Sequence, residues 1–507
     1  MMHDVIVVGS GIGGLTCAAK LAKNGLKVLV LEKNPHIGGT CANFKRGEYY
    51  FPMGPLSFSF PGRVQAFFDE LGIPDKIDFK RNHFQLLTPG LDIVYSKPIK
   101  TLGQELKNMF PEESDGIVRI TDELSDIIGL GRDLDRWHPD FLAGLKKKKA
   151  LELIHPPDQE KIRAITTYSA SVSSEVLDRV IGDVRLKNFI GSQGTSPPEM
   201  SMLNLAFTWN AMSEVGIWFP SGGIHGLCRR LEEAVLSRGG EIKTATPVTE
   251  IIVHKGRADG VRTDGGDYKA GWFVSNADYK KTFLELMDFS GIDEAFLGIV
   301  RDVPYTGSEL CVYLGVRARD IDFSRMKATH VFFQKEVRQD AVNNLEDFDS
   351  REVEVCRWSD NAVDSAPSGR ASLVLRVSFP YHHFSFWRTA EKRRKKGYKE
   401  YKTDLAGRLI ETVEHILPGL SGSIEVMKVA TPLTYRDCCQ RFCGSVAGWT
   451  WSAESASILP GKLLIETPIR NLFMAGIYAA TELFLGGVAT AMHTAGLAAD
   501  LVLEAKA

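Results

Sequence analysis

The sequence predicts an α/β protein that contains a Rossmann-like dinucleotide-binding domain. Three observations predict this fold class. A short β-branched strand, Val5–Val8, leads directly into a G-x-G-x-x-G motif. A helix-forming segment and a second apolar strand, Leu26–Leu31, follow the glycines. A third strand, Leu472–Ala475, is also followed by glycines and a helix-forming segment that runs to about Leu503. Strands that alternate with helices in this way favour a parallel sheet.

The glycine motif predicts a binding site for a nucleotide diphosphate. Its first glycine permits a tight turn, its second lets the backbone approach the diphosphate, and its third lets the helix pack on the strand. The helix is predicted over Leu15–Asn24, and Gly25 ends it. Its free amide groups and positive dipole end would face the phosphates. The residues assigned to this contact are Gly9, Ser10, Gly11, Ile12, Gly13 and Gly14.

An acidic residue ends the second strand at the position that a ribose-binding carboxylate requires. Glu32 lies 18 residues after Gly14, and its carboxylate can accept both hydroxyl groups of an adenosine ribose. The same charge would repel a 2′-phosphate, so the sequence disfavours NADP. Lys33, the next residue, is assigned to the same site.

The residues after Glu32 favour FAD over NAD. In a simple NAD domain the second strand would lead into another ordinary crossover. Here the glycine pair Gly38-Gly39 follows after six residues, and Thr40 comes next. A ligand that extends beyond the diphosphate needs such a close approach to the backbone. Gly54 and Pro55, at the end of an aromatic segment, are assigned to the same site.

From these residues onward the chain resembles the FAD-dependent phytoene desaturase, carotenoid isomerase and retinol saturase-like flavoproteins, within the wider amine-oxidase-like superfamily. The resemblance covers most of the length in separate blocks that keep the order and approximate spacing of the family. Those blocks are residues 4–55 with "GGT" and "YYFPMGP", residues 216–278 with "TPVTEI" and "VSNAD", residues 430–437 with "ATPLTYRD", and residues 471–503.

The resemblance implies a Rossmann-like FAD-binding domain with an inserted α+β substrate-binding domain. The FAD-binding domain would be discontinuous, comprising residues 1–73, 216–289 and 430–507. Residues 74–215 and 290–429 would form the substrate-binding domain over the flavin. Within this second domain, the residue pattern predicts a strand at Glu309–Val316 and a helix at Tyr398–Leu420.

Further cofactor contacts are implied by the same resemblance. The backbone of Val248 would hold the edge of the adenine. Gly476, Gly487 and Val488 would lie near the flavin, with the start of the last helix stabilising negative charge on its pyrimidine ring. Many relatives carry a polar residue after the glycine that matches Gly476, whereas this chain has Ile477. No cysteine lies between Gly476 and Val488, which favours non-covalent FAD.

The resemblance implies a redox or isomerising enzyme that acts on carbon–carbon double bonds of a long hydrophobic molecule, such as a carotenoid, a retinoid or an unsaturated lipid. Desaturation, saturation and cis–trans isomerisation all fit the sequence. No second G-x-G-x-x-G motif follows a later strand. Electrons would therefore pass directly between the flavin and an external acceptor or donor, such as oxygen or a quinone. A flavin amine oxidase and a non-catalytic FAD-containing lipid carrier are the alternatives.

Candidates for proton transfer lie in or after the flavin-binding turn of the last block. Glu482 and Tyr478 are the catalytic candidates, because a titratable side chain near the ring is needed if the reaction moves a proton. His493 lies inside the last helix and is expected to be a core residue. His382 and His383 would face the substrate only if the second domain placed them there, and the sequence indicates no partner for them.

Composition restricts the remaining function classes. The 507 residues carry a formal net charge of -2, which does not favour nucleic acid. The eight cysteines include no CxxC pair and no zinc-ligand spacing, so no metal site is predicted. The N-terminus lacks signal-peptide features and no run of about 18 apolar residues occurs, which predicts a cytoplasmic protein.

Two basic runs leave attachment to a membrane surface open. Lys146–Lys149 and Lys392–Lys396 are expected to be solvated surface, and binding to anionic lipid headgroups is the alternative. Aromatic residues gather in "YYFPMGPLSFSF" and "YHHFSFW". Core packing explains most of them, and a tunnel for an apolar substrate would use the rest.

Overall fold

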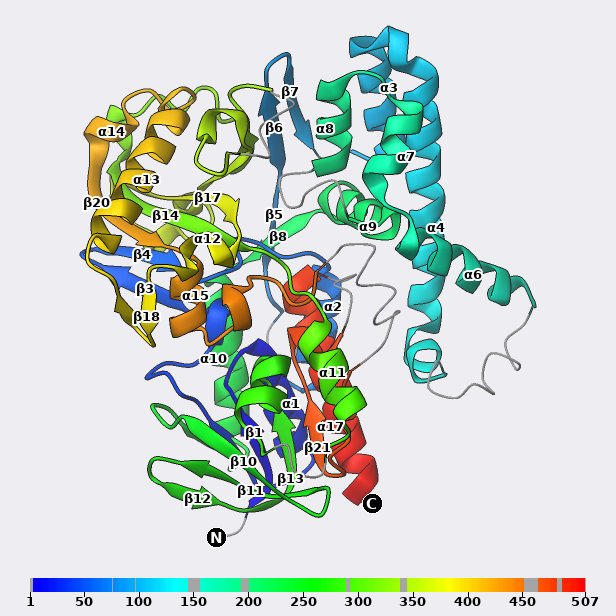
Figure 1. Cartoon of the computed structure of the whole chain (residues 1–507), viewed down its shortest axis with the longest axis vertical. Coiled ribbons are helices and arrows are strands. Elements are labelled where there is room, and N and C mark those ends of the chain that lie inside the picture. Colours follow the sequence, from blue (N-terminus) through cyan, green and yellow to red (C-terminus); the bar gives the residue numbers. More distant parts are fainter. Residues whose placement is uncertain are drawn as a thin grey trace.

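The computed structural model describes residues 3–74, 76–95, 97–144, 156–192, 200–288, 292–337, 344–450, 464–480 and 486–506. Two large β-sheets and a group of helices organise this part of the chain (Figure 1). The N- and C-terminal segments lie together at the same end of the molecule, beside the first sheet (Figure 1).

The first sheet is parallel throughout and has five strands in the order β21-β13-β1-β2-β9. Its central strand is completely buried at Val5, Ile6 and Val7, as a strand covered by helices on both faces requires. The α/β class with a Rossmann-like sheet is thereby confirmed. The strands are β1 (His3–Val8), β2 (Val28–Leu31), β9 (Glu241–Lys243), β13 (Ala270–Ser275) and β21 (Leu472–Met474).

Helices α1 (Ile12–Lys23), α2 (Pro61–Glu70), α10 (Gly223–Leu236) and α17 (Gly486–Lys506) pack around this sheet. The first helix begins at Ile12 rather than at the predicted Leu15, because Gly11 already has the extended backbone of a cap (φ -60°, ψ 167°). The second strand begins at Val28 rather than Leu26, because the amide of Leu26 still bonds to the carbonyl of Leu21 in the helix end.

A small antiparallel sheet of β10 (Val248–His254), β11 (Arg257–Thr263) and β12 (Gly266–Tyr268) lies beside the first sheet (Figure 1). Its first strand begins at Val248, the residue assigned to the adenine. Shorter strand pairs are β3 (Asn43–Arg46) with β4 (Tyr49–Pro52), β5 (Phe79–Asn82) with β8 (Ile217–Pro220), and β18 (Arg388–Ala390) with β19 (Arg393–Arg394).

The second large sheet is mixed and has seven strands in the order β20-β14-β17-β16-β15-β6-β7. Only its β15–β6 pair is parallel among the pairs in the described residues. The strands are β6 (Phe84–Thr88), β7 (Leu91–Tyr95), β14 (Ser308–Arg317), β15 (His330–Phe333), β16 (Val353–Arg357), β17 (Arg370–Phe379) and β20 (Ile424–Ala430).

The two faces of this second sheet differ in character. Leu310, Val312 and Leu314 of β14 lie in a hydrophobic core with residues of α13 (Tyr398–Glu414). Cys311 and Tyr313 alternate with them and belong to the core that also contains β1. We call the face that carries Glu309, Cys311 and Tyr313 the inner face, because its core is shared with the first sheet.

Helix α13 ends at Glu414, six residues before the predicted end at Leu420. The chain turns at Gly419 (φ 90°), and the Gly419 amide donates a hydrogen bond to the Glu414 side chain. The short α14 (Leu420–Ser423) follows. Proline at position 418 cannot continue a helix, so α13 ends before it. The predicted strand at 309–316 is present within β14.

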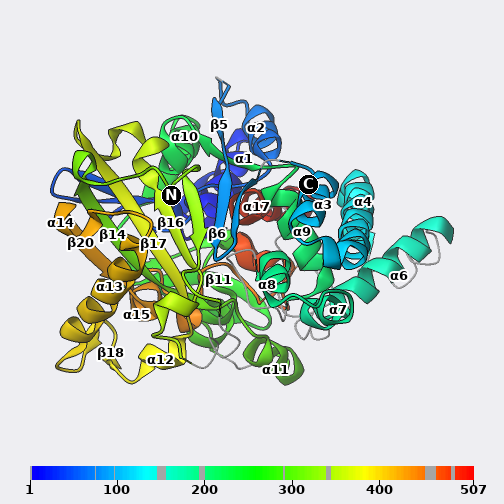
Figure 2. The ribbon, with the colours of Figure 1, turned by 90° about the horizontal axis from the view of Figure 1, so that it is seen from above.

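A group of helices stands beside the second sheet (Figure 2). Trp209 is completely buried at the centre of this group, and its indole Nε1 donates to the Ile190 carbonyl at 3.0 Å. The helices are α3 (Ile99–Met109), α4 (Ser114–Gly144), α6 (Pro156–Ala170), α7 (Ser173–Val180), α8 (Val184–Ser192) and α9 (Met202–Met212). The remaining helices are α11 (Glu294–Asp302), α12 (Tyr381–Ser385) and α15 (Pro432–Cys438).

None of the helices in the described ranges combines the length and the apolar character needed to cross a lipid bilayer. The basic run at residues 146–149 lies outside the described residues.

Candidate functional site

The G-x-G-x-x-G motif forms a turn that only glycine fits. Gly9 has a φ of 95°, and its amide bonds to the Leu31 carbonyl at 2.8 Å. A methyl group added at Gly14 would come within 2.0 Å of the Gly9 carbonyl oxygen. Helix α1 therefore packs directly on the loop that precedes it, and its N-terminus stays open toward a ligand.

The second glycine pair lies against this loop. Gly38 forms a β-bridge with Gly11, and its amide donates to the Ser10 carbonyl at 2.9 Å. A methyl group on Gly39 would lie 3.2 Å from the Gly11 Cα. We call Gly9, Gly11, Gly14, Gly38 and Gly39 the glycine cradle, since these residues expose backbone rather than side chains.

Gly54 brings the aromatic segment to the edge of the glycine cradle. A methyl group added at this position would lie 2.8 Å from the Thr40 carbonyl oxygen. The predicted residues Gly54 and Thr40 are therefore in contact, although fourteen positions separate them in the sequence.

Glu32 is buried at the carboxyl end of β2, and hydrogen bonds from Ser10 and Asn34 hold its carboxylate. Its Oε2 accepts hydrogen bonds from the amide (2.8 Å) and the hydroxyl (2.7 Å) of Ser10. Its Oε1 accepts from the Asn34 amide at 2.9 Å. The Lys33 Nζ donates to the Cys438 carbonyl at 2.5 Å and to Asn34 Oδ1 at 3.4 Å.

The segment that precedes Val248 runs along the same edge. The amide of Thr246 donates to the Glu32 carbonyl, and the amide of Ala245 donates to the Asn34 carbonyl, both at 2.8 Å. Val248 itself is half-buried at the start of β10. The structure therefore brings the segment just before this predicted residue against the backbone of Glu32 and Asn34.

Asn276, which sequence reasoning did not single out, fills the space between the glycine loop and the C-terminal segment. Its backbone amide donates to the Val8 carbonyl at 2.9 Å. A methyl group on Gly11 would lie 2.7 Å from its Nδ2, and one on Gly476 would lie 2.2 Å from its Oδ1. The "VSNAD" block contained the signal, but the sequence did not show which of its side chains turns inward.

The C-terminal glycines lie beside helix α1. A methyl group on Gly13 would lie 2.8 Å from the Gly476 Cα and 2.9 Å from the Ala491 carbonyl oxygen. The Thr494 hydroxyl donates to the Gly476 carbonyl at 2.8 Å, which fixes α17 to this turn. Gly487 and the buried Val488 lie in the first turn of α17, which begins at Gly486. Glu482 lies outside the described residues.

Tyr478 is buried and engaged in hydrogen bonds. Its hydroxyl lies 2.6 Å from the Ser445 Oγ, and its carbonyl accepts from the Trp449 indole at 3.0 Å. Burial raises the pKa of Tyr478 above its ordinary value, so the phenol is neutral near pH 7. The side chain is therefore a neutral hydrogen-bonding group in this position.

Asp278, also in the "VSNAD" block, anchors the adjacent loop. Its carboxylate accepts from the Tyr305 hydroxyl at 2.9 Å, the Phe442 amide at 3.0 Å and the Lys281 amide at 3.1 Å. Burial raises the pKa of Asp278 despite these bonds. Tyr305 stacks on Trp449 with ring centroids 5.1 Å apart. Aromatic rings thus surround this acid.

A charged cluster lies on the inner face of the second sheet, and sequence reasoning missed it. Arg376 Nε donates to Glu354 Oε2 at 2.8 Å, and its Nη1 lies 3.8 Å from Glu309. His330 Nδ1 lies 3.2 Å from Glu354. The Tyr435 hydroxyl donates to Glu309. These residues come from four separate strands and a helix, so no local sequence pattern unites them.

The electrostatics of this cluster separate its two carboxyl groups. Burial raises the pKa of Glu309. Burial also opposes ionisation of Glu354, but the adjacent Arg376 and His330 outweigh it and lower its pKa to about 2. Glu354 is therefore ionised at neutral pH.

The remaining histidine candidates are packed elsewhere. His493 is half-buried, and its ring centroid lies 6.3 Å from that of Phe67. His383 does have partners, contrary to the sequence interpretation: its Nε2 lies 2.7 Å from the Tyr401 hydroxyl and 3.3 Å from Glu346. These partners belong to α13 and its surroundings rather than to the glycine cradle.

Several members of the two aromatic segments are core residues. Phe51 is completely buried in the core shared with the first sheet, and Phe384 is completely buried in the α13 core. Of the basic run 392–396, Arg394 is held internally by Asp437 at 2.6 Å. This run is therefore not uniformly free surface.

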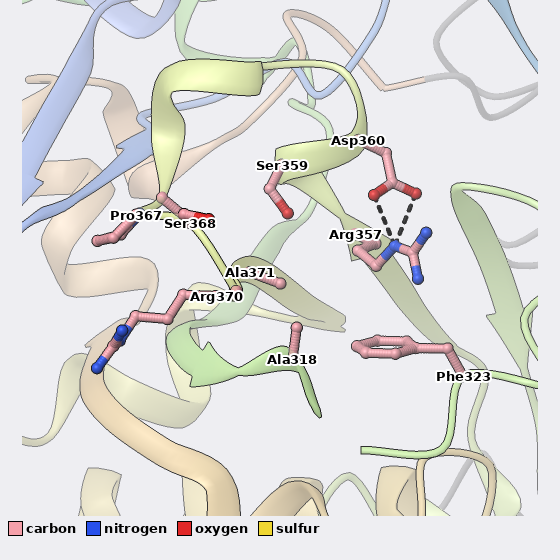
Figure 3. A pocket seen from close by; sticks show the side chains of 11 residues that line it. Ala318, Phe323, Arg357, Ser359, Asp360, Pro367, Ser368, Arg370 and Ala371 are labelled. Atoms are coloured by element: carbon pink, nitrogen blue, oxygen red, sulfur yellow. Dashed lines mark hydrogen bonds and ion pairs between the residues drawn. The ribbon is translucent and has the colours of Figure 1, made fainter. Parts of the chain in front are cut away.

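A cavity of about 460 Å³ opens between the short 3-10 helix Trp358–Asp360 and the start of β17 (Figure 3). Arg357 borders it, pairs with Asp360 at 2.6 Å and lies over the ring of Phe323. No residue of the glycine cradle lines this cavity. Among the described residues, no group of three or more His, Cys, Asp or Glu side chains could hold a metal ion.

Comparison with known proteins supports the interpretation of the glycine cradle as part of a dinucleotide-binding domain. Residues 7–71 match the family model of an NAD(P)-binding Rossmann-like domain. Among solved structures, a redesigned putrescine oxidase superposes with a TM-score of 0.65 at 14% identity and covers 99% of each chain. That likeness concerns the fold.

Relatives of similar length cover the whole chain. A chloroplastic prolycopene isomerase from Arabidopsis thaliana is 28% identical over 541 residues, which is 100% of this chain and 84% of the relative. An all-trans-retinol 13,14-reductase from Danio rerio is 26% identical over 546 residues, which is 99% of this chain and 86% of the relative. A further Danio rerio relative bears the name of an inactive all-trans-retinol 13,14-reductase.

Proposed function

Because this chain is related over its full length to the phytoene desaturase, carotenoid isomerase and retinol saturase-like proteins, we propose that it is an FAD-dependent oxidoreductase. Its substrates would be long hydrophobic molecules such as carotenoids or retinoids, and it would act on their carbon–carbon double bonds. The observation that carries this proposal is the full-length similarity to proteins named for prolycopene isomerisation and retinol reduction.

The residues present fit FAD. The glycine cradle offers bare backbone at Gly11 and Gly39, where added methyl groups would meet other backbone or side-chain atoms. The buried Nδ1 of His225, next to Gly38, has no hydrogen-bond partner in the described part of the chain. Such an atom is costly unless a ligand or water satisfies it. A dinucleotide that lay along the cradle would supply polar groups there.

The roles of the protein residues follow from their positions. Glu32 would accept the ribose hydroxyls, and the amides at the start of α1 would bind the diphosphate. The backbone of Val248 would hold the adenine, and Gly476, Gly487 and Val488 would border the ring. Bound FAD would supply reversible transfer of hydride or electrons. The chain would contribute orientation, exclusion of water and the electrostatic field of α17.

We propose further that residues 74–215 and 290–429 form the substrate-binding domain, and that residues 1–73, 216–289 and 430–507 bind FAD. The strand composition of the two sheets supports this division. The five-stranded sheet takes all its strands from the residues assigned to FAD, and the seven-stranded sheet takes its strands from the other residues, apart from Ala430 at the end of β20. A substrate held between the two sheets would lie near the ring. Tyr478 would serve as a neutral hydrogen-bonding group there, and Glu482 stays a candidate for proton transfer.

One experiment distinguishes saturation, isomerisation and desaturation. Purified protein loaded with FAD is first reduced with dithionite without oxygen, and a cis-polyene such as prolycopene or a retinol is then added. Reoxidation of the flavin with loss of a double bond indicates saturation. Double-bond isomerisation without a net flavin change indicates an isomerase. Oxidised protein that introduces a double bond, with oxygen or a quinone as acceptor, indicates a desaturase.

The same preparation tests the alternatives. Failure of every polyene to change the flavin spectrum or the isomer composition would contradict the proposed enzyme. Tight binding of a lipid without such a change favours a non-catalytic carrier. One relative, from Danio rerio, is named as an inactive reductase. Release of peroxide on addition of amines and oxygen would instead identify an amine oxidase.

A further inference from the structure

A guanidinium group lies beside the glycine cradle, although its residue comes from the distant loop after α15. Arg441 Nη2 donates to the Thr40 hydroxyl at 3.2 Å. Two backbone carbonyls of its own loop fix the other side of the group: Nη1 donates to Ser445 at 3.3 Å and to Val446. The guanidinium carbon lies 6.0 Å from the ring centroid of Tyr478. The side chain thus joins "GGT" to the turn before α17.

The positive charge of this group is not neutralised by an adjacent carboxylate. Arg441 forms no ion pair with any carboxylate in the described ranges of the chain, and the oxygens that accept its hydrogen bonds are neutral. Asp278 is in the vicinity, but its oxygens accept from Tyr305, Phe442 and Lys281. A half-buried cation in this setting attracts an anionic ligand, because a partner offsets the cost of its partial desolvation.

The position of Arg441 decides what that ligand is. Lack of a counter-ion does not by itself mark a site, since Arg351 is likewise held by the Leu345 and Ser378 carbonyls beside an aromatic ring. Arg351, however, lies against the α13 core. Arg441 instead contacts the residue after Gly39, and Gly39 packs against Gly11, where the backbone approaches a diphosphate.

We propose that Arg441 binds the diphosphate of the dinucleotide, so that the loop after α15 completes the diphosphate part of the site, whose other residues lie in the first forty positions. This inference rests on the proposed function, because it assumes that the nucleotide is the FAD of that site. A guanidinium can offer two parallel N–H groups to a phosphate, which suits Arg better than Lys for this task. Thr40 would orient the group by accepting one of its hydrogens.

The test compares Arg441→Met with the matched control Arg351→Met. Affinities for FAD, ADP and adenosine are measured by calorimetry on the cofactor-free full chain. Arg441→Met is expected to weaken FAD and ADP by the same factor, about tenfold to a hundredfold, which is typical for loss of a charged hydrogen bond. Adenosine affinity should not change, and Arg351→Met should leave all three affinities unchanged.

Three outcomes would overturn the proposal. Unchanged affinities in Arg441→Met would remove Arg441 from the site. A loss for FAD without a loss for ADP would place the guanidinium at the ring or the ribityl chain instead. An equal loss in Arg351→Met would mean that any buried arginine has this effect through the fold.

Two further measurements keep the inference separate from the proposed function. If the wild-type protein takes up no FAD, the proposed function fails, and the ADP series still decides the role of Arg441. If Arg441→Met does not fold by circular dichroism, Arg441→Lys replaces it. That variant keeps the charge but loses the paired N–H groups, and it is expected to weaken ADP by about threefold to tenfold. Unchanged ADP affinity in Arg441→Lys would then contradict the proposal.

Discussion

Arg376 lies between two carboxylates on the inner face of the seven-stranded sheet, where 21% of its side chain is exposed. Glu354 and Glu309 keep only 12% of their side chains exposed, so water does little to stabilise their charges. Removal of one partner from such a pair is costly, because it leaves the other charge without compensation. The cluster therefore ties the charge state of single residues to the stability of the whole sheet.

The pKa of Glu354 gives the cluster a defined pH dependence. Its folded value of about 2 lies below the ordinary value of 4.5. A lowered folded pKa stabilises the protein above the ordinary value, and this contribution is lost as pH falls from about 4.5 toward 2. The difference corresponds to about 3 kcal/mol as an order of magnitude. Glu354→Gln should therefore lower the thermal midpoint at pH 7 and flatten its dependence on pH below 4.5.

Thermal unfolding of the wild type and of Glu354→Gln, followed at about five pH values between about 2.5 and 7, measures this difference. Glu425→Gln is the matched control, because Glu425 pairs with Arg370 at 2.6 Å but at a more exposed position. A Glu354→Gln curve parallel to that of the wild type would show that this carboxyl group does not carry the acid sensitivity.

At the scale of elements, the short helix α15 sets the direction of the loop that carries Arg441. Thr431 caps this helix, and its backbone amide donates to the Thr434 hydroxyl at 3.1 Å in a reciprocal capping box. The Thr431 hydroxyl also lies 2.6 Å from that of Tyr398 at the start of α13. One residue therefore joins two helices and the end of β20. The resemblance blocks had included "ATPLTYRD", but its capping role depends on the helix that follows.

Thr431→Ala should lower the free energy of unfolding by about 1–2 kcal/mol, because it removes the cap and leaves the buried Tyr398 hydroxyl without this partner. Urea unfolding followed by tryptophan fluorescence measures the change. Thr403→Ala is the control, since the Thr403 hydroxyl only bonds to Lys399 on an exposed part of α13. Equal losses in the two variants would mean that the capping box adds nothing measurable.

At the scale of the whole molecule, the two ends of the chain build one site. Helix α17 packs against α1, and Lys506 pairs with Asp4 at 2.9 Å. The middle of the chain supplies Asn276, and the loop after α15 supplies Arg441. A ligand in the glycine cradle would therefore contact segments that are hundreds of residues apart in the sequence. Binding should stabilise these segments together rather than one at a time.

Hydrogen exchange with and without FAD tests this expectation. FAD at about a hundredfold its dissociation constant should add about 2.7 kcal/mol of stability. Slower exchange is expected in β1 with α1, in β13 and in β21 with α17, whereas α7 and α8 should change little. Protection confined to residues 9–40 would contradict a site built from both ends of the chain.

The nucleotide-binding part of the fold followed from the sequence because its determinants are local. Gly9, Gly14 and Glu32 lie within one strand–helix–strand unit, where backbone sterics and hydrogen bonds between near neighbours fix the geometry. The starts of α1 and β2 and the end of α13 were misplaced by two to six residues, because caps and turns there depend on individual backbone angles.

The sequence by itself determined the Rossmann-like class, the glycine loop and the carboxylate at the end of β2. Only the tertiary structure decided that Asn276 lies between Gly11 and Gly476, that Arg441 reaches Thr40 across 401 positions, and that charged residues of four strands meet on the inner face. Contacts of this kind depend on how whole sheets and helices pack, and no periodicity or spacing within one segment records that packing.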